Sequence, residues 1–225
     1  MQAIMESIFD ICYLVLVVSI GAFMIVKGRK NKQYLLFGIM AVTLGLGDSF
    51  HLIPRVIALN STNFDDYIEV LGIGKLITSI TMTAFYVLLY YVWRVRYDIK
   101  GKQNLTISII LLSIIRIILC VFPQNDWLVK NPSVSWGVYR NIPFALIGLI
   151  IIIIFYNSAK KFGDKHFKWM WLTIVLSFAF YIPVVLFVNK VPMLGLLMIP
   201  KTCAYIWTVL IGYFDMKKEL KLYQK

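Results

Sequence analysis

Long apolar segments alternate with short polar ones along almost the whole chain. Seven apolar segments are long enough to cross about 30 Å of hydrocarbon, because a helix rises by about 1.5 Å per residue. They cover roughly residues 7–26, 34–54, 67–93, 104–122, 139–157, 168–189 and 192–214. Pro54 is expected to end the second helix, and Pro192 is expected to begin the seventh. The pattern therefore predicts an all-α integral membrane bundle of seven transmembrane helices.

The order of these segments gives no sign of separate domains. No linker rich in Pro, Gly or Ser interrupts them, and no segment repeats another. The first apolar segment has neither a basic region before it nor a small-residue cleavage site. It is therefore expected to be a retained helix and not a signal peptide. We expect one seven-helix transmembrane domain spanning residues 1–225.

Composition agrees with a membrane location, since 60% of the 225 residues are hydrophobic and 15% are charged. Soluble domains average about 45–50% apolar and about 25% charged residues. In a soluble protein, the formal net charge of +12 would suggest nucleic acid. Here the basic residues lie mostly in short segments between apolar ones, so membrane topology explains the charge and nucleic-acid binding is not expected.

The basic residues in these polar segments are distributed unequally between the two predicted sides of the membrane. Sixteen lie on one side and four on the other. The sixteen are Lys27, Arg29, Lys30, Lys32, Arg94, Arg96, Lys100, Lys102, Lys160, Lys161, Lys165, Lys168, Lys217, Lys218, Lys221 and Lys225, and the four are Arg55, Lys130, Arg140 and Lys190. Because Lys and Arg accumulate in cytoplasmic loops, this distribution predicts an outside N-terminus and a cytoplasmic C-terminus. The chain is expected to be a multi-pass protein of the cell membrane.

Four charged residues lie deep inside predicted helices, namely Asp48, Lys75, Arg116 and Lys201. Each lies roughly 9–13 Å below the outer end of its own helix, at about 1.5 Å per residue. A charge at such a depth costs on the order of 3 kcal/mol and normally faces the bundle interior or a water-filled cavity. The sequence therefore predicts a polar, basic pocket in the outer half of the bundle. A purely structural network of these charges is the alternative.

Other polar residues are expected to join this layer. His51 follows Asp48 by three positions and shares its helical face, so Asp48 and His51 are the candidates for acid–base catalysis. Arg55 is expected at the rim, after Pro54. Tyr205 lies one turn below Lys201, and Tyr181 precedes Pro183 by two residues, although simple packing is the alternative role for both tyrosines. The candidate ligand-binding residues are Lys75, Arg116, Lys201, Arg55, Tyr181 and Tyr205.

Several other chemistries lack the residues that they need. The chain has two histidines, and His166 falls in a cytoplasmic segment, so no metal site is predicted. Ser49 points about 100° away from Asp48 on a helix, which argues against a Ser–His–Asp triad within this turn. Lys201 in the seventh helix resembles the retinal-binding lysine of microbial rhodopsins, but Leu197 occupies the position where that family commonly has a carboxylate. No cofactor is predicted, and the cysteines (Cys12, Cys120 and Cys203) are expected to be buried small hydrophobes.

The segment GDSFHLIPR, residues 47–55, resembles the Gly-Asp signature of the YhhN family of polytopic membrane proteins. The matching residues are Gly47, Asp48, Leu52, Pro54 and Arg55. In the next helix, Gly74, Ser79 and Tyr86 continue the resemblance, while Ile80 stands where the family has a histidine. The resemblance covers about 50 residues. It implies an eight-helix ancestor whose first helix is missing here.

The resemblance implies a lysoplasmalogenase-like hydrolase of lysolipids, in which Asp48 is the base. The family's second aspartate lies in a late Ser-Asp motif, and here Phe178 follows Ser177 instead. Three hypotheses therefore stay open. The chain is a hydrolase, a receptor or transporter that binds an anionic or lipid ligand in the same pocket, or a membrane scaffold. Membrane lipids and an anionic ligand or lysolipid are the expected partners.

Overall fold

The computed structural model describes residues 2–222. This part of the chain forms an all-α bundle of seven long helices without strands. The helices are α1 (Gln2–Gly28), α2 (Lys32–Leu59), α3 (Ile68–Arg96), α4 (Gln103–Val121), α5 (Val134–Phe162), α6 (Met170–Phe187) and α7 (Met198–Leu222). Short 3-10 helices precede α3 (η1, Phe64–Tyr67), follow α4 (η2, Pro123–Asn125) and precede α7 (η3, Pro192–Leu197). The predicted fold class is confirmed.

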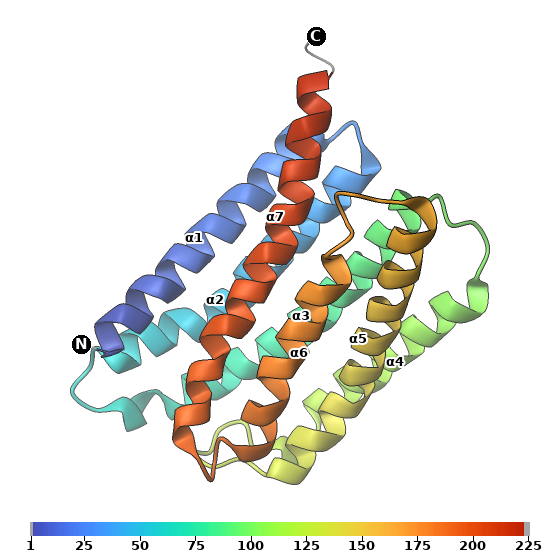
Figure 1. The fold of residues 1–225 in the computed structure, drawn as a ribbon. Helices are drawn as coiled ribbons and strands as arrows, with labels where there is room; N and C mark the ends of the chain where they lie inside the picture. The colour runs from blue at the N-terminus through green and yellow to red at the C-terminus, as the bar shows by residue number, and fades with distance from the viewer. Residues whose placement is uncertain (1, 223–225) are drawn as a thin grey trace.

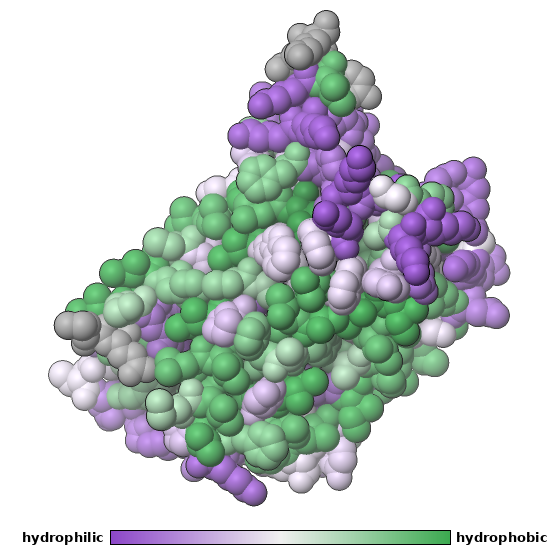
Figure 2. Space-filling view, in the orientation of Figure 1, coloured by the Kyte–Doolittle hydropathy of each residue, from purple (hydrophilic) through white to green (hydrophobic). Residues whose placement is uncertain are grey.

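All seven segments are long and apolar enough to cross a membrane. Figure 2 shows apolar residues over the middle of the molecule, with polar residues gathered towards its ends. Many large apolar side chains are exposed on this surface, among them Val15 at 62% and Ile107 at 62%. An exposed apolar belt between polar ends is typical of a multi-pass membrane protein.

The helices lie side by side along one common direction (Figure 1). α2 packs closely against both α1 and α3, and α4 contacts α3 and α5. α7 packs on α6 and also reaches α1 and α2, so it joins the two ends of the helix order. The core between them is rich in aromatic side chains such as Tyr86, Trp93, Phe155 and Phe167, each at most 1% exposed.

Small residues let the first helices approach at the level of the backbone. A Cβ atom placed on Gly38 of α2 would lie 2.8 Å from the carbonyl oxygen of Gly21 and 2.8 Å from the amide nitrogen of Ile25, both on α1. Such a distance is shorter than any ordinary contact, so only glycine fits. Helices in membranes commonly associate through small residues in this way.

One prediction about a helix end was wrong, and another was right only in part. Pro54 does not end the second helix, because α2 continues through it to Leu59 and also includes Arg55. A proline inside a helix removes one hydrogen bond, the one to the carbonyl four residues earlier, and the chain keeps its helical path. Here that carbonyl belongs to Phe50, and it lies beside Gly74 of α3. Pro192 begins η3, and α7 itself starts at Met198.

The prediction about the cysteines was only partly right. Cys120 is buried, but Cys12 and Cys203 are exposed on the outer surface of the bundle. A thiol on a lipid-facing surface has an apolar environment just as a buried one does, so the sequence pattern did not distinguish the two positions.

Candidate functional site

Asp48 lies half-buried on α2 and bonds to the neighbouring helix α1. Its Oδ2 accepts a hydrogen bond of 2.6 Å from the hydroxyl of Tyr13, a side chain that is 1% exposed. The first partner of this carboxylate is therefore a tyrosine and not one of the predicted bases. Ser49, next to Asp48, donates instead to the carbonyl of Leu46 within its own helix.

Arg116 on α4 is a buried charged residue with unpartnered hydrogen-bond donors. The residue is 2% exposed, and its guanidinium carbon lies 3.3 Å from the ring centroid of Phe144 on α5. Its Nε and Nη1 have no hydrogen-bond partner within residues 2–222. A guanidinium group cannot lose its proton, so burial without an anion leaves a charge and two donors uncompensated.

Lys201 on α7 points into the same region. Its Nζ lies 4.9 Å from the ring centroid of Tyr181 and 5.5 Å from that of Tyr205. The ammonium group is within electrostatic range of both Asp48 and Arg116. No ion pair within 4.0 Å joins Lys201 to an acid in the described part of the chain. We call Asp48, Arg116 and Lys201 the interior charge cluster.

The structure thus brings together three of the four charges that the sequence placed in one layer, and both predicted tyrosines with them. Tyr181 donates to the side-chain oxygen of Asn141 on α5 over 3.2 Å, and Tyr205 is 4% exposed. Their rings cover the lysine, which is a favourable position for a cation.

Lys75 and Arg55 form a second group that the sequence did not separate from the first. Lys75 is exposed, and its charge interacts with Arg55 and Arg140. Arg55 itself forms an ion pair of 2.5 Å with Glu6 of α1. His51 lies with its Nδ1 3.2 Å from the carbonyl oxygen of Leu71, so this nitrogen carries the proton in that contact. His51 therefore contacts α3, although it shares a helix with Asp48.

Asp10 on α1 is a buried acid that the sequence analysis missed. It is 7% exposed, and its Oδ2 has no hydrogen-bond partner within residues 2–222. It interacts electrostatically with Glu6, Arg55 and Asp48. Its spacing from Tyr13 could have indicated that it faces the interior, because residues three apart share a helical face. The interior therefore holds a second carboxylate near Asp48.

A separate polar network lies at the end of the bundle that is rich in Lys and Arg. Arg96 donates from Nε and Nη2 to both oxygens of Asp164, at 2.9 and 3.0 Å, and from Nη1 to Asp215 at 2.5 Å. His166 Nδ1 lies 2.6 Å from the other oxygen of Asp215, and Lys218 contacts its Nε2. These contacts fasten α3, the segment between α5 and α6, and α7 to one another.

Asp164, one of the two acids of this network, lies outside the membrane-spanning segments. Burial on its own raises the pKa of Asp164, but the hydrogen bonds from Arg96 and from the backbone amides of Phe167 and His166 outweigh it. The pKa of Asp164 is therefore held below its ordinary value. Because its acids, Asp164 and Asp215, are paired with basic side chains, this network stabilises the fold.

Comparisons with protein-family models, with curated proteins and with solved structures find no match to this chain. The functional argument therefore depends on the geometry alone. Within residues 2–222 no three His, Cys, Asp or Glu side chains lie together so that they could hold a metal ion. The interior charge cluster is the candidate functional site.

Proposed function

We propose that the interior charge cluster binds the anionic group of an amphiphilic ligand, of the lysolipid class, without cleaving it. The observation that carries the proposal is Arg116, a buried guanidinium with two unpartnered nitrogens. Such a group is strongly unfavourable unless an anion pairs with it. A planar guanidinium is also the side chain that best matches the oxygens of a phosphate or carboxylate.

The balance of charge supports the same proposal. Arg116 and Lys201 face a single acid in the cluster, Asp48, and that acid already accepts a bond from Tyr13. Asp10 interacts with Glu6, Arg55 and Asp48, and the basic residue among these three is Arg55, which lies outside the cluster. One positive charge is left over, and an anionic ligand would neutralise it.

An apolar cleft beside the cluster favours an amphiphile over a free ion. This cleft of about 140 Å³ lies between α5 and α6, and its lining includes Phe144, Phe178 and Tyr181. Phe144 is the ring below Arg116, and Tyr181 is one of the rings below Lys201. A ligand with its anionic group at the two cations would therefore have an apolar surface next to it for a hydrocarbon chain.

Native mass spectrometry of the purified protein with lysophosphatidylglycerol and lysophosphatidylcholine tests the proposal. The anionic lipid is expected to bind, and Arg116→Gln and Lys201→Gln are each expected to weaken its binding about tenfold or more. Arg116→Lys is expected to restore part of the affinity. Lys190→Gln is the matched control, because it removes the same charge from an exposed position between α6 and η3. Equal binding of both lipids, unchanged by Arg116→Gln in a folded protein, would contradict the proposal.

Hydrolysis of the lysolipid is a second candidate function. The specific observation in its favour is the second buried carboxylate, Asp10, within electrostatic range of Asp48. Paired acids allow one to act as a base while the other stays protonated. The YhhN resemblance of residues 47–55 agrees with this candidate. Incubation with lysoplasmalogens, followed by mass spectrometry of the products, distinguishes it: turnover must disappear in Asp48→Asn while binding persists, and bound lipid without products excludes it.

A further inference from the structure

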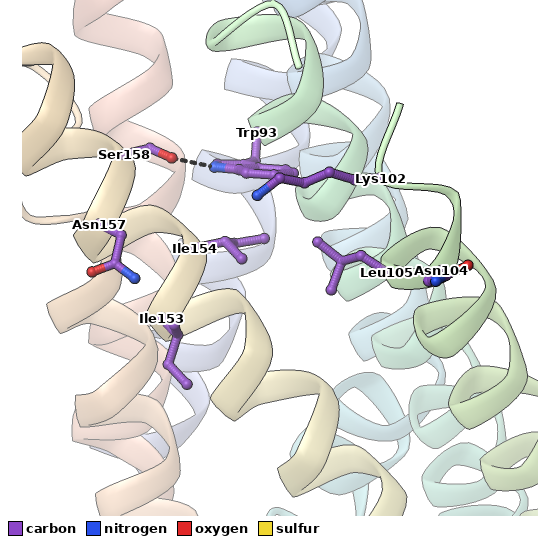
Figure 3. A pocket seen from close by; sticks show the side chains of 8 residues that line it. All are labelled: Trp93, Lys102, Asn104, Leu105, Ile153, Ile154, Asn157 and Ser158. Atoms are coloured by element: carbon purple, nitrogen blue, oxygen red, sulfur yellow. Dashed lines mark hydrogen bonds between the residues drawn. The ribbon is translucent and has the colours of Figure 1, made fainter. Parts of the chain in front are cut away.

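A groove that shares no residue with the interior charge cluster lies at the end rich in Lys and Arg. It is a groove of about 460 Å³ between the beginning of α4 and the end of α5 (Figure 3). Its lining combines Trp93 with aliphatic side chains, one lysine and two asparagines. We propose that this groove binds an anionic phospholipid of the surrounding bilayer, with the phosphate at Lys102 and part of an acyl chain on the aliphatic wall.

The floor of the groove is a fixed aromatic surface. Trp93 of α3 is 1% exposed, and its Nε1 donates to the hydroxyl of Ser158 on α5 over 2.9 Å. Figure 3 shows the Lys102 side chain lying over this indole, with Ile154 and Leu105 on opposite walls. The Lys102 Nζ is 5.8 Å from the indole centroid.

The charge of the groove suits a phosphate. Lys102 forms no ion pair with any acid of residues 2–222, whereas its neighbour Lys100 pairs with Asp98 at 3.4 Å. Asn104 and Asn157 are exposed at the sides of the groove and carry amide donors. Arg94, close by, is already engaged with Thr106 and with the carbonyls of the loop. The groove thus offers one unpaired cation and two neutral donors, without an acid in its lining.

The apolar side of the groove opens towards the lipid-facing surface. Ile153 on its α5 wall is 48% exposed, and Ile107, one turn further along α4 from its lining residues, is 62% exposed. A bilayer lipid reaches this wall laterally, while a soluble phosphate compound would leave it bare. The basic end of the bundle is also the one predicted to face the cytoplasm, where anionic lipids are concentrated. These two features favour a lipid as the occupant.

Delipidated protein in detergent, titrated with dioleoyl phosphatidylglycerol or dioleoyl phosphatidylcholine and followed by native mass spectrometry, tests the inference. Phosphatidylglycerol is expected to bind preferentially. Lys102→Gln is expected to weaken it about fivefold, the usual contribution of one lysine near an anionic headgroup. Lys100→Gln is the matched control, since it removes the same charge from the same loop at a position already paired with Asp98. It is expected to change the affinity less than twofold.

A second variant tests the groove without changing its charge. Asn157→Phe places a ring in the hollow and is expected to reduce phosphatidylglycerol binding as much as Lys102→Gln. Three results would each overturn the inference in a protein with an unchanged circular dichroism spectrum: equal binding of both lipids, equal losses in Lys100→Gln and Lys102→Gln, or displacement of the lipid by soluble glycerol phosphate. None of these results affects the interior charge cluster, whose own test uses Arg116 and Lys201.

Discussion

The Tyr13 hydroxyl donates a hydrogen bond to Asp48 across the α1–α2 interface. Removal of a single donor from a buried polar pair leaves the partner unsatisfied, which costs about 1–3 kcal/mol. The loss of a single hydroxyl group in this interior is therefore expected to change the stability of the protein, even where the side chain keeps its shape.

Tyr13→Phe is accordingly expected to lower the stability of the protein by about 1–3 kcal/mol, because Asp48 loses its donor. Thermal unfolding in detergent, followed by circular dichroism, measures the change. Tyr156→Phe is the control, since Tyr156 is 46% exposed. Equal melting temperatures of the two variants would show that the Tyr13–Asp48 bond does not contribute to stability.

The lowered pKa of Asp164 predicts a dependence of stability on pH. The folded protein binds fewer protons at this site than the unfolded chain, so this contribution is present above the ordinary pKa of about 3.9. It is lost as the pH falls from about 4 through the lower pKa of the folded state. The melting temperature should therefore decrease as the pH falls through this window.

Asp164→Asn removes that dependence and is expected to destabilise the protein by about 1.5–3 kcal/mol at neutral pH, because Arg96 loses two charged hydrogen bonds. Melting temperatures measured between pH 3 and pH 7 compare the variant with the parent. Asp98→Asn, whose side chain is 82% exposed, is expected to behave like the parent. A variant with the same acid sensitivity as the parent would show that other carboxylates cause it.

Contacts between whole helices depend on glycine at the crossing of α1 and α2. Gly38→Ala would place a methyl group 2.8 Å from the backbone of α1, so the helices must move apart. Overpacking of this kind costs about 1–3 kcal/mol, and the loss is measurable as a lower melting temperature. Gly137→Ala on α5 is the matched control, because the nearest atom to its added methyl group would be 3.8 Å away. A similar loss in both would indicate a general effect of helix glycines.

The helices themselves were predictable from the sequence, and their ends were not. Apolar length alone identifies each span, since hydrocarbon requires continuous helix. A helix that leaves the hydrocarbon keeps its hydrogen bonds in water, so α5 extends over Lys160 and Lys161 without any apolar signal. Pro54 misled the prediction for a different reason: in a membrane bundle a neighbouring helix accommodates a proline that a soluble helix would avoid.

At the scale of the whole molecule, the sequence located single charges but not their partners. Asp48, Arg116 and Lys201 stand out because each interrupts an apolar segment. The contact between Tyr13 and Asp48 joins residues 35 positions apart, and only the packing of complete helices creates it. The link between Arg96 and Asp215 spans 119 positions and depends on α3 and α7 meeting at one end. Periodicity within one helix contains no information on such pairs.

The orientation of the bundle in the membrane is a prediction of the charge distribution. In a background with Cys12, Cys120 and Cys203 replaced by Ala, a membrane-impermeant maleimide is expected to label Asn131→Cys in intact cells. Lys165→Cys is expected to react only after the membrane is permeabilised. Both positions are exposed. The reverse labelling pattern would mean that the N-terminus lies in the cytoplasm.

The close packing of α2 against α1 and α3 has a consequence for how the protein is made. Synthesis proceeds from the N-terminus, and early segments generally fold first. The ribosome therefore completes α1 with Tyr13 and α2 with Asp48 before it reaches Arg116 of α4 and Lys201 of α7. Arg116 and Lys201 therefore enter a membrane that already contains the Asp48 carboxylate. The order of translation thus places Asp48 in the membrane before the two cations of the interior charge cluster arrive.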